Sequence, residues 1–182
     1  MKLAYPSCVG YCAVMLSVVI EALNVEAALA RTLASLVEGA VEGVVREVLV
    51  VDGGSSDSTR EIAEQAGCTV LSGIGLGEVI AGAKGNWLLF IEPGARLSED
   101  WAAGTDAYIA AQAAMPARFT PLRVGRRPLF TWSFARPRAL SQGFLISKKR
   151  AAARAKSADS AEALVRGMAA KTLPVGIWPA AS

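Results

Sequence analysis

The segment Asp52-Gly-Gly-Ser55 follows a run of β-branched and leucine residues and combines a carboxylate, two glycines and a hydroxyl. A carboxylate at this point can accept hydrogen bonds from a nucleobase imide or from ribose hydroxyls. The glycines allow a tight turn with positive φ, and Ser55 together with the N-terminus of the next helix suits an anion. The alternative interpretation is a capped turn that stabilises the fold and binds no ligand.

The sequence of 182 residues contains no histidine, which excludes every mechanism that needs an imidazole as acid, base or metal ligand. Its three cysteines, Cys8, Cys12 and Cys68, form neither an even disulfide set nor the ligand set of a tetrahedral zinc site. We therefore expect reduced thiols in a cytoplasmic protein, with any chemistry resting on carboxylates, hydroxyls and cations.

Strand and helix patterns alternate through the first half of the chain, which indicates a mainly parallel sheet flanked by helices. The predicted strands span residues 16–20, 44–51, 69–71 and 87–91. In an open α/β sheet, ligands bind beyond the carboxyl ends of the strands. The candidate site therefore consists of the segments that follow three of these strands: Glu21–Asn24, Asp52–Asp57 and Glu92–Gly94.

Capping residues predict where the first two helices begin and end. Asn24 is the expected N-cap of a helix that ends at Gly39. Ser58 and Glu61 have the spacing of a capping box, which predicts the start of the next helix.

The second half of the chain gives weaker signals, because prolines interrupt its periodicity beyond residue 116. A helix is expected over Ser98–Ala114, with Ser98 as its cap. Further on we predict a strand over 143–147, a helix over 151–170 and a closing edge strand over 175–178.

The chain length fits one domain that spans residues 1–182. The first residues carry one lysine and then an apolar run, a pattern shared by secretory signal peptides and buried strands. The β-branched character of Leu16–Ile20 favours a strand, so residues 1–14 are expected to be a loose N-terminal extension. The alternative is a small secreted or membrane-surface binding protein with a cleaved leader.

The net charge of +3 is distributed unevenly, since residues 107–158 carry 11 basic side chains and no acidic ones. One interpretation is a solvated cationic face. The other is a surface for anionic lipid or a membrane, formed by residues 118–156 with Phe130 and Trp132 among the cations. No nucleic-acid-binding motif accompanies this charge, so no nucleic acid is expected as a partner.

Three linked segments, residues 16–24, 47–62 and 83–97, resemble the inverting family 2 glycosyltransferases, which have the nucleotide-diphospho-sugar transferase fold called GT-A. The resemblance implies a single Rossmann-like α/β domain with an abbreviated C-terminal part. In such a domain residues 15–101 would form the nucleotide-binding half and residues 102–182 the acceptor-side half. The implied activity is inverting hexosyl transfer from a nucleotide-diphospho-sugar donor to an unknown acceptor.

The resemblance also implies roles for individual residues. Nucleotide binding would fall to five residues: Asn24, Asp52, Gly53, Ser55 and Lys84. The metal site of the family lies at the end of the fourth strand, where Glu92 would hold Mg²⁺ or Mn²⁺ against the diphosphate.

The sequence departs from the family pattern at several functional points, among them the metal site, the phosphate-binding loop before the fourth strand and the general base. The D-x-D motif of the family is replaced by Glu92-Pro-Gly94, which supplies one carboxylate. Ser141 stands where relatives carry the aspartate that acts as general base, and a serine of ordinary acidity cannot take that role. No catalytic residue is assigned, and the alternative function is a degenerate, non-catalytic GT-A domain that serves as a binding or scaffold module.

Overall fold

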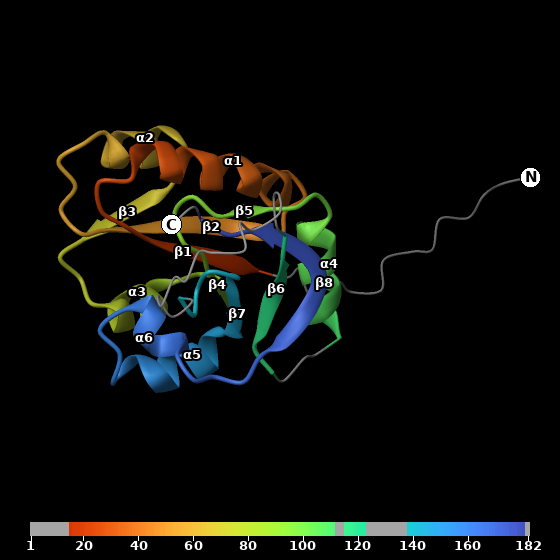
Figure 1. Ribbon diagram of the computed structural model, residues 1–182. Coiled ribbons are helices and arrows are strands. Elements are labelled where there is room, and N and C mark those ends of the chain that lie inside the picture. Colours follow the sequence, from red (N-terminus) through yellow and green to blue (C-terminus); the bar gives the residue numbers. More distant parts are fainter. Residues whose placement is uncertain (1–14, 112–114, 123–137, 181–182) are drawn as a thin grey trace, which may run out of the picture.

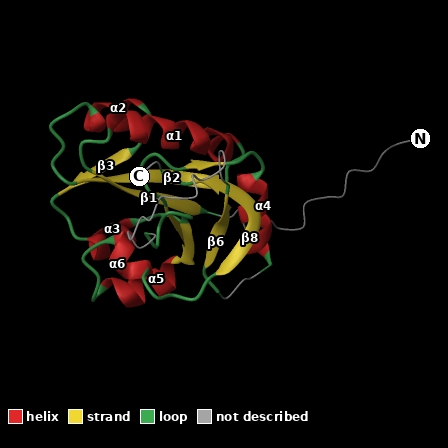
Figure 2. Cartoon of the chain, viewed as in Figure 1, coloured by secondary structure: helices red, strands yellow, loops and turns green. Residues whose placement is uncertain are grey.

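The computed structural model describes residues 15–111, 115–122 and 138–180. These residues form one eight-stranded sheet with the strand order β3-β2-β1-β4-β7-β6-β8-β5. Helices α1 and α2 cover one face of the parallel part of this sheet, and α3, α5 and α6 cover the other face (Figures 1 and 2). None of the helices in the described ranges is long and apolar enough to cross a membrane.

The first half of the chain forms the parallel part of the sheet. β1 pairs in parallel with both β2 and β4, and β2 pairs in parallel with β3. The prediction of a mainly parallel sheet flanked by helices is confirmed, because the runs of β-branched residues coincide with these strands. The elements are β1 Leu16–Ala22, α1 Glu26–Val41, β2 Val45–Asp52, α2 Thr59–Gln65, β3 Thr69–Ser72, α3 Leu76–Gly82 and β4 Trp87–Phe90.

The second half of the chain extends the sheet with mixed pairing. β7 lies antiparallel to β4 and to β6, whereas β6 and β8 are parallel. The elements are β5 Arg96–Leu97, α4 Trp101–Ala110, β6 Ala117–Pro121, β7 Phe144–Ser147, α5 Lys148–Ala155, α6 Ala161–Val165 and β8 Lys171–Trp178.

Several predictions for the second half are wrong. The helix expected over 151–170 is divided into α5 and α6, because the chain turns between them and α6 begins at its own N-cap, Ser160, whose side chain accepts the N–H of Ala163. The strand expected at the edge of the sheet is β8, which is longer than predicted and lies between β6 and β5.

The sheet separates two hydrophobic cores. In β1, Val18 and Ile20 pack into the core beneath α1, and Val19 packs into the core beneath α3, α5 and α6. Because successive strand residues point to opposite faces, a strand buried on both faces must be apolar at nearly every position. This double burial fixes the strands that carry the polar segments at their carboxyl ends.

The ends of α1 differ from the prediction. Asn24 has a left-handed backbone with φ of 52°, and Val25 is the N-cap residue, without a side-chain capping bond. The helix also continues through Gly39, where a Cβ atom would overlap the buried ring of Trp101. Gly39 is therefore a packing residue, and the chain reverses at Gly43, whose φ is 75°.

The caps of α2 and α4 also form differently. Ser58 precedes α2 but makes no side-chain capping bond, and instead Asp57 Oδ1 accepts the N–H of Thr59 at 3.0 Å. Ser98 is not a helix cap, because its Oγ accepts the N–H of Gly176 at 3.0 Å and so joins the loop to β8. Helix α4 follows Asp100, which has a left-handed backbone with φ of 66°.

Candidate functional site

Asp52 is the last residue of β2 and is buried, with 7% of its surface exposed. Its Oδ1 atom accepts two hydrogen bonds from Ser55, one from Oγ at 2.6 Å and one from the backbone N–H at 3.0 Å. These bonds, and first the bond from the side chain, hold the pKa of Asp52 below its usual value. The site therefore contains a fixed, ionised carboxylate at neutral pH.

The loops that follow β1 and β2 are joined by hydrogen bonds. Ser55 Oγ accepts the N–H of Asn24 at 3.0 Å, and Asn24 Oδ1 accepts the N–H of Ser56 at 2.8 Å. Gly53 donates its N–H to the carbonyl of Ala22 at 2.9 Å. We call Asn24 and residues 52–56 the loop clasp, and the left-handed backbone of Asn24 allows its side chain to reach across.

The loop clasp is supported by the starts of α1 and α2. The N–H of Val25 donates to Thr59 Oγ1 at 2.9 Å, and the N–H of Ser58 donates to Glu26 Oε2 at 3.2 Å. Four of the predicted nucleotide-binding residues are thus brought together in a rigid arrangement: Asn24, Asp52, Gly53 and Ser55.

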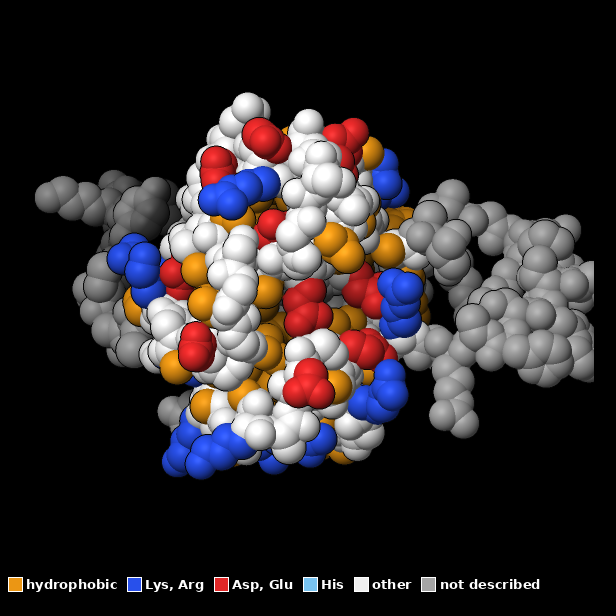
Figure 3. Space-filling view, turned by 90° about the vertical axis from the view of Figure 1, so that its left-hand side faces the viewer, with side chains coloured by type: hydrophobic (Ala, Val, Ile, Leu, Met, Phe, Trp, Pro, Cys, Tyr) orange, Lys and Arg blue, Asp and Glu red, His pale blue; other side chains and the backbone are white. Residues whose placement is uncertain are grey.

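A cleft of about 650 Å³ opens at the carboxyl ends of β1 and β4. Figure 3 faces this edge of the sheet and shows acidic side chains gathered around a hollow with hydrophobic walls. Val25, which adjoins Asn24 of the loop clasp, is one of its lining residues. The lining residues are Val19, Glu21, Val25, Ile91, Glu92, Pro93, Arg138, Ala139, Leu140, Ala161, Glu162 and Arg166.

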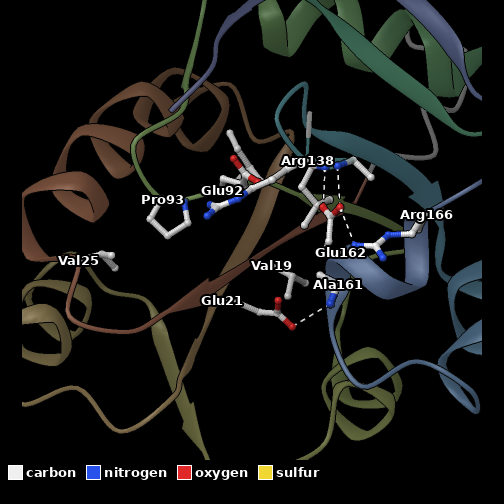
Figure 4. A pocket seen from close by; sticks show the side chains of 12 residues that line it. Val19, Glu21, Val25, Glu92, Pro93, Arg138, Ala161, Glu162 and Arg166 are labelled. Atoms are coloured by element: carbon white, nitrogen blue, oxygen red, sulfur yellow. Dashed lines mark hydrogen bonds and ion pairs between the residues drawn. The ribbon is translucent and has the colours of Figure 1, made fainter. Parts of the chain in front are cut away.

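Glu92 lies in this cleft, two residues beyond the end of β4, and is half-buried. Burial raises the pKa of its carboxyl group, the charge of Arg138 opposes this effect, and the charge of Glu162 adds to it. Figure 4 shows Arg138 extended across the cleft toward Glu92. A carboxylate from the first half of the chain and a guanidinium from the second half thus line the same cleft.

Sequence reasoning missed the role of Glu162, which comes from α6. Its two carboxylate oxygens accept the N–H groups of Ala139 at 2.8 Å and Leu140 at 3.1 Å, and Oε1 lies 3.6 Å from an Arg166 nitrogen (Figure 4). Glu162 thus fixes the turn that begins at Arg138. No local motif marks this contact, because it depends on where α6 packs.

Glu21 is the other carboxylate of the cleft. Its side chain, near the end of β1, accepts the N–H of Ala161 at 2.9 Å and so ties β1 to the start of α6. Burial raises the pKa of Glu21, the bond from Ala161 opposes the rise, and the charge of Glu162 adds to it. The sequence placed Glu21 in a segment that could bind a ligand, but not its contact with a residue 140 positions away.

Lys84 is not brought together with the other predicted nucleotide-binding residues. It precedes β4, so it lies at the opposite edge of the parallel strands from their carboxyl ends. Its Nζ is 3.6 Å from Glu47 Oε2, near the start of β2. Lys84 would reach the site only from a loop at the carboxyl edge of the sheet. Instead, the chain at Lys84 leads directly into β4 from the other edge.

The residues at the end of β4 do not fit a divalent cation held by carboxylates. Mg²⁺ and Mn²⁺ prefer several oxygen ligands, and Glu92 is followed by proline and glycine. Within the described ranges no group of three or more acidic, cysteine or histidine side chains is arranged to hold a metal ion. Glu21 and Glu162 line the same cleft, but both Glu162 oxygens and Oε1 of Glu21 already accept backbone N–H groups.

The basic region falls partly outside the described residues, which omit 123–137 and therefore Phe130 and Trp132. Three of its described cations bind backbone carbonyls: Arg118 that of Met168, Arg154 that of Leu164, and Lys148 those of residues 81 and 83. Part of this positive charge therefore stabilises the fold.

Comparison with known proteins finds one family model that matches the first half of the chain. The family model described as "Glycosyl transferase family 2" matches residues 17–92, a range that includes Asn24, Asp52 and Glu92. Residues 17–92 thus resemble the family 2 glycosyltransferases, as the sequence motifs predicted. A search of the curated proteins finds no match.

Among solved structures, the chain is similar to glucosyl-3-phosphoglycerate synthase from Mycobacterium tuberculosis, crystallised with Mn²⁺, uridine diphosphate and glucosyl-3-phosphoglycerate. The identity is 25% and the TM-score 0.50, over 74% of this chain and 57% of the synthase. TarS from S. aureus (residues 1–349) shares the fold at 18% identity and a TM-score of 0.59, over 82% of this chain and 52% of TarS. The chain therefore spans little more than half the length of either protein.

Proposed function

We propose that this protein transfers a hexosyl group, with inversion, from a nucleotide-diphospho-sugar donor to an acceptor. The observation that carries the proposal is the position of the loop clasp beside the cleft, both at the carboxyl edge of the parallel strands. The match of residues 17–92 to family 2 glycosyltransferases and the uridine diphosphate bound by the M. tuberculosis synthase support it.

In this proposal the nucleoside binds at the loop clasp. The ionised Asp52 accepts the imide N–H of the base, and Asn24, Gly53 and Ser55 surround the nucleoside. Because Asp52 Oδ1 is already fixed by Ser55, the carboxylate needs no reorganisation when the base arrives.

The diphosphate and the sugar then extend into the cleft. Residues 15–101 supply the nucleotide-binding half, and residues 102–182 supply Arg138 and the acceptor side. A cation beside the diphosphate stabilises the negative charge that develops on it as the glycosidic bond breaks. Uridine is the base that we favour, because the synthase was crystallised with uridine diphosphate.

The test is the release of nucleoside diphosphate from UDP-, GDP- and dTDP-sugars by the purified chain, with and without Mn²⁺. We expect one donor to be turned over, and Asp52→Asn to weaken its binding. A chain that binds and releases none of these nucleotides would contradict the proposal.

A second candidate function, a non-catalytic binding or scaffold domain, is favoured by the state of the polar groups around the cleft. Glu21 and Glu162 bind backbone amides, and Ser141 Oγ donates to the carbonyl of Arg138 at 2.8 Å. No free general base is therefore positioned at these three residues. Nucleotide binding without donor turnover, in the presence of a broad set of acceptors, would support this candidate over the first.

The remaining proposals concern the location of the protein. We propose a cytoplasmic protein that contacts an anionic lipid surface through residues 118–156, on the basis of their basic charge. Co-sedimentation with vesicles containing anionic lipid, lost on reversal of charge at Arg126 and Arg127, would support this contact. Equal recovery with neutral and anionic vesicles would contradict it.

A further inference from the structure

The cleft into which the proposed function extends the diphosphate contains a cationic side chain, Arg138. Arg138 lines the cleft and extends toward Glu92 (Figure 4). Its charge acts on the Glu92 carboxyl group without a direct ion pair between them. Arg138 is exposed, so its guanidinium donors are accessible to a ligand that enters the cleft.

The other two carboxylates of the cleft, Glu21 and Glu162, already accept hydrogen bonds from backbone N–H groups. Both oxygens of Glu162 accept backbone N–H groups, and Oε1 also lies 3.6 Å from Arg166. Glu21 accepts the N–H of Ala161. Drawing the Glu162 carboxylate toward a metal would weaken the bonds that hold the turn after Arg138.

The backbone that carries Arg138 is held in position by hydrogen bonds. The turn that follows it is closed by the hydrogen bond from the N–H of Ser141 to the carbonyl of Arg138 at 3.1 Å, and it is clamped by the two bonds to Glu162. From this anchored backbone, the planar guanidinium can give two parallel hydrogen bonds to phosphate oxygens, which a lysine cannot do.

From these contacts we infer that the cleft binds the diphosphate of its nucleotide ligand through the Arg138 guanidinium, without a divalent cation, and that Glu162 is the positioning residue for Arg138. The inference rests on the proposed function, because it assumes that the ligand is a nucleoside diphosphate derivative. It departs from the metal site that the family resemblance implies, because the end of β4 supplies one carboxylate, Glu92, as a metal ligand.

The experiment is a calorimetric titration of the full chain with UDP, GDP and dTDP, each in EDTA and in excess Mn²⁺, and with the corresponding nucleosides. We expect the preferred diphosphate to bind equally well, within about 2-fold, in EDTA and in Mn²⁺. Arg138→Ala should weaken diphosphate binding about 10-fold or more, the scale of a charge-assisted bond to phosphate, and leave nucleoside binding unchanged.

Two further variants separate positioning from charge. Arg138→Lys keeps the charge but loses the planar fork, so its affinity should fall between those of wild type and Arg138→Ala. Glu162→Gln should weaken the binding of the diphosphate but not of the nucleoside, a selective effect that general loss of structure would not give. Arg46→Ala removes an exposed cation from the opposite edge of the strands and serves as the charge control.

Three results would overturn the inference. Diphosphate binding that disappears in EDTA and returns with Mn²⁺ would show a metal-dependent site. Equal affinities for Arg138→Ala and Arg46→Ala would show that Arg138 does not bind the phosphates. Absence of binding by every nucleoside and diphosphate would contradict the proposed function itself, whereas the first two results would leave the nucleoside site in place.

Discussion

Replacing Ser55 with alanine tests whether the loop clasp is the rigid base of the site. The substitution removes an oxygen that donates to Asp52 Oδ1 at 2.6 Å and accepts from the N–H of Asn24 at 3.0 Å. A bond to a charged group contributes about 1.5–3 kcal/mol and a neutral bond about 1 kcal/mol, and the remaining N–H bond to Asp52 limits the loss. We therefore expect Ser55→Ala to lower the free energy of unfolding by about 2–3 kcal/mol.

The matched control is Ser56→Ala. Ser56 Oγ makes one exposed bond, to Asn24 Oδ1 at 3.3 Å, so its loss should change stability by no more than about 0.5 kcal/mol. Urea unfolding of the two variants and the wild type gives both values, and the melting temperature of Ser55→Ala should fall by roughly 4–10 °C. Equal stabilities for the two variants would refute the argument that Ser55 organises the loops after β1 and β2.

Three further predictions follow from individual contacts. Gly39→Ala should lower the free energy of thermal unfolding by about 1–3 kcal/mol, because its Cβ would overlap the Trp101 ring. The control Gly77→Ala should not lower it, because a Cβ there makes only ordinary contact. Equal melting temperatures for the two variants would contradict this prediction. The pKa of Asp52 in the folded state lies below the usual 3.8, so the stabilisation by its carboxylate is present above that pH and is lost as the pH falls through the folded value. The free energies of unfolding of Asp52→Asn and wild type, measured between about pH 2 and pH 7, should therefore converge in acid. A difference in free energy that stays constant with pH would contradict this prediction. Burial raises the pKa of Glu92 in the folded state above the usual 4.5, so the wild type loses stability as the pH rises above 4.5. Over that range Glu92→Gln should become more stable relative to the wild type. A relative gain in the stability of Glu92→Gln below pH 4.5 would contradict burial as the cause of the shift.

The parallel half of the fold could be predicted from sequence because its strands are buried on both faces. Leu16–Ile20 is almost entirely apolar and residues 44–51 are apolar except at Arg46 and Glu47, and the polar segments after them mark the carboxyl edge. The order of strands and polar segments then placed Asp52, Ser55 and Asn24 at one edge, which the structure confirms.

Helix ends could not be predicted with the same success because tertiary contacts decide them. Asn24 and Ser98 have the side chains of capping residues, but each bonds across to another part of the chain, Asn24 to Ser56 and Ser98 to Gly176. Gly39 resembles a helix stop, yet its small size serves the packing of Trp101. Local helix propensity therefore does not decide a helix end where a residue makes such a tertiary contact.

The second wall of the cleft was inaccessible to sequence reasoning for a different reason. Arg138 and Glu162 lie far apart in the chain, and Glu162 binds the two residues after Arg138 only because α6 packs beside that turn. Glu21 was noticed only as a residue in a strand-end segment, and its bond to Ala161 depends on the same packing.

The most direct test of the account is a crystal structure of the chain soaked with uridine diphosphate in EDTA. We predict density for the base beside Asp52 and Asn24 and for the diphosphate beside Arg138. A nucleotide bound elsewhere, or one whose phosphates order only when Mn²⁺ is added and lie against Glu92 rather than Arg138, would contradict the account.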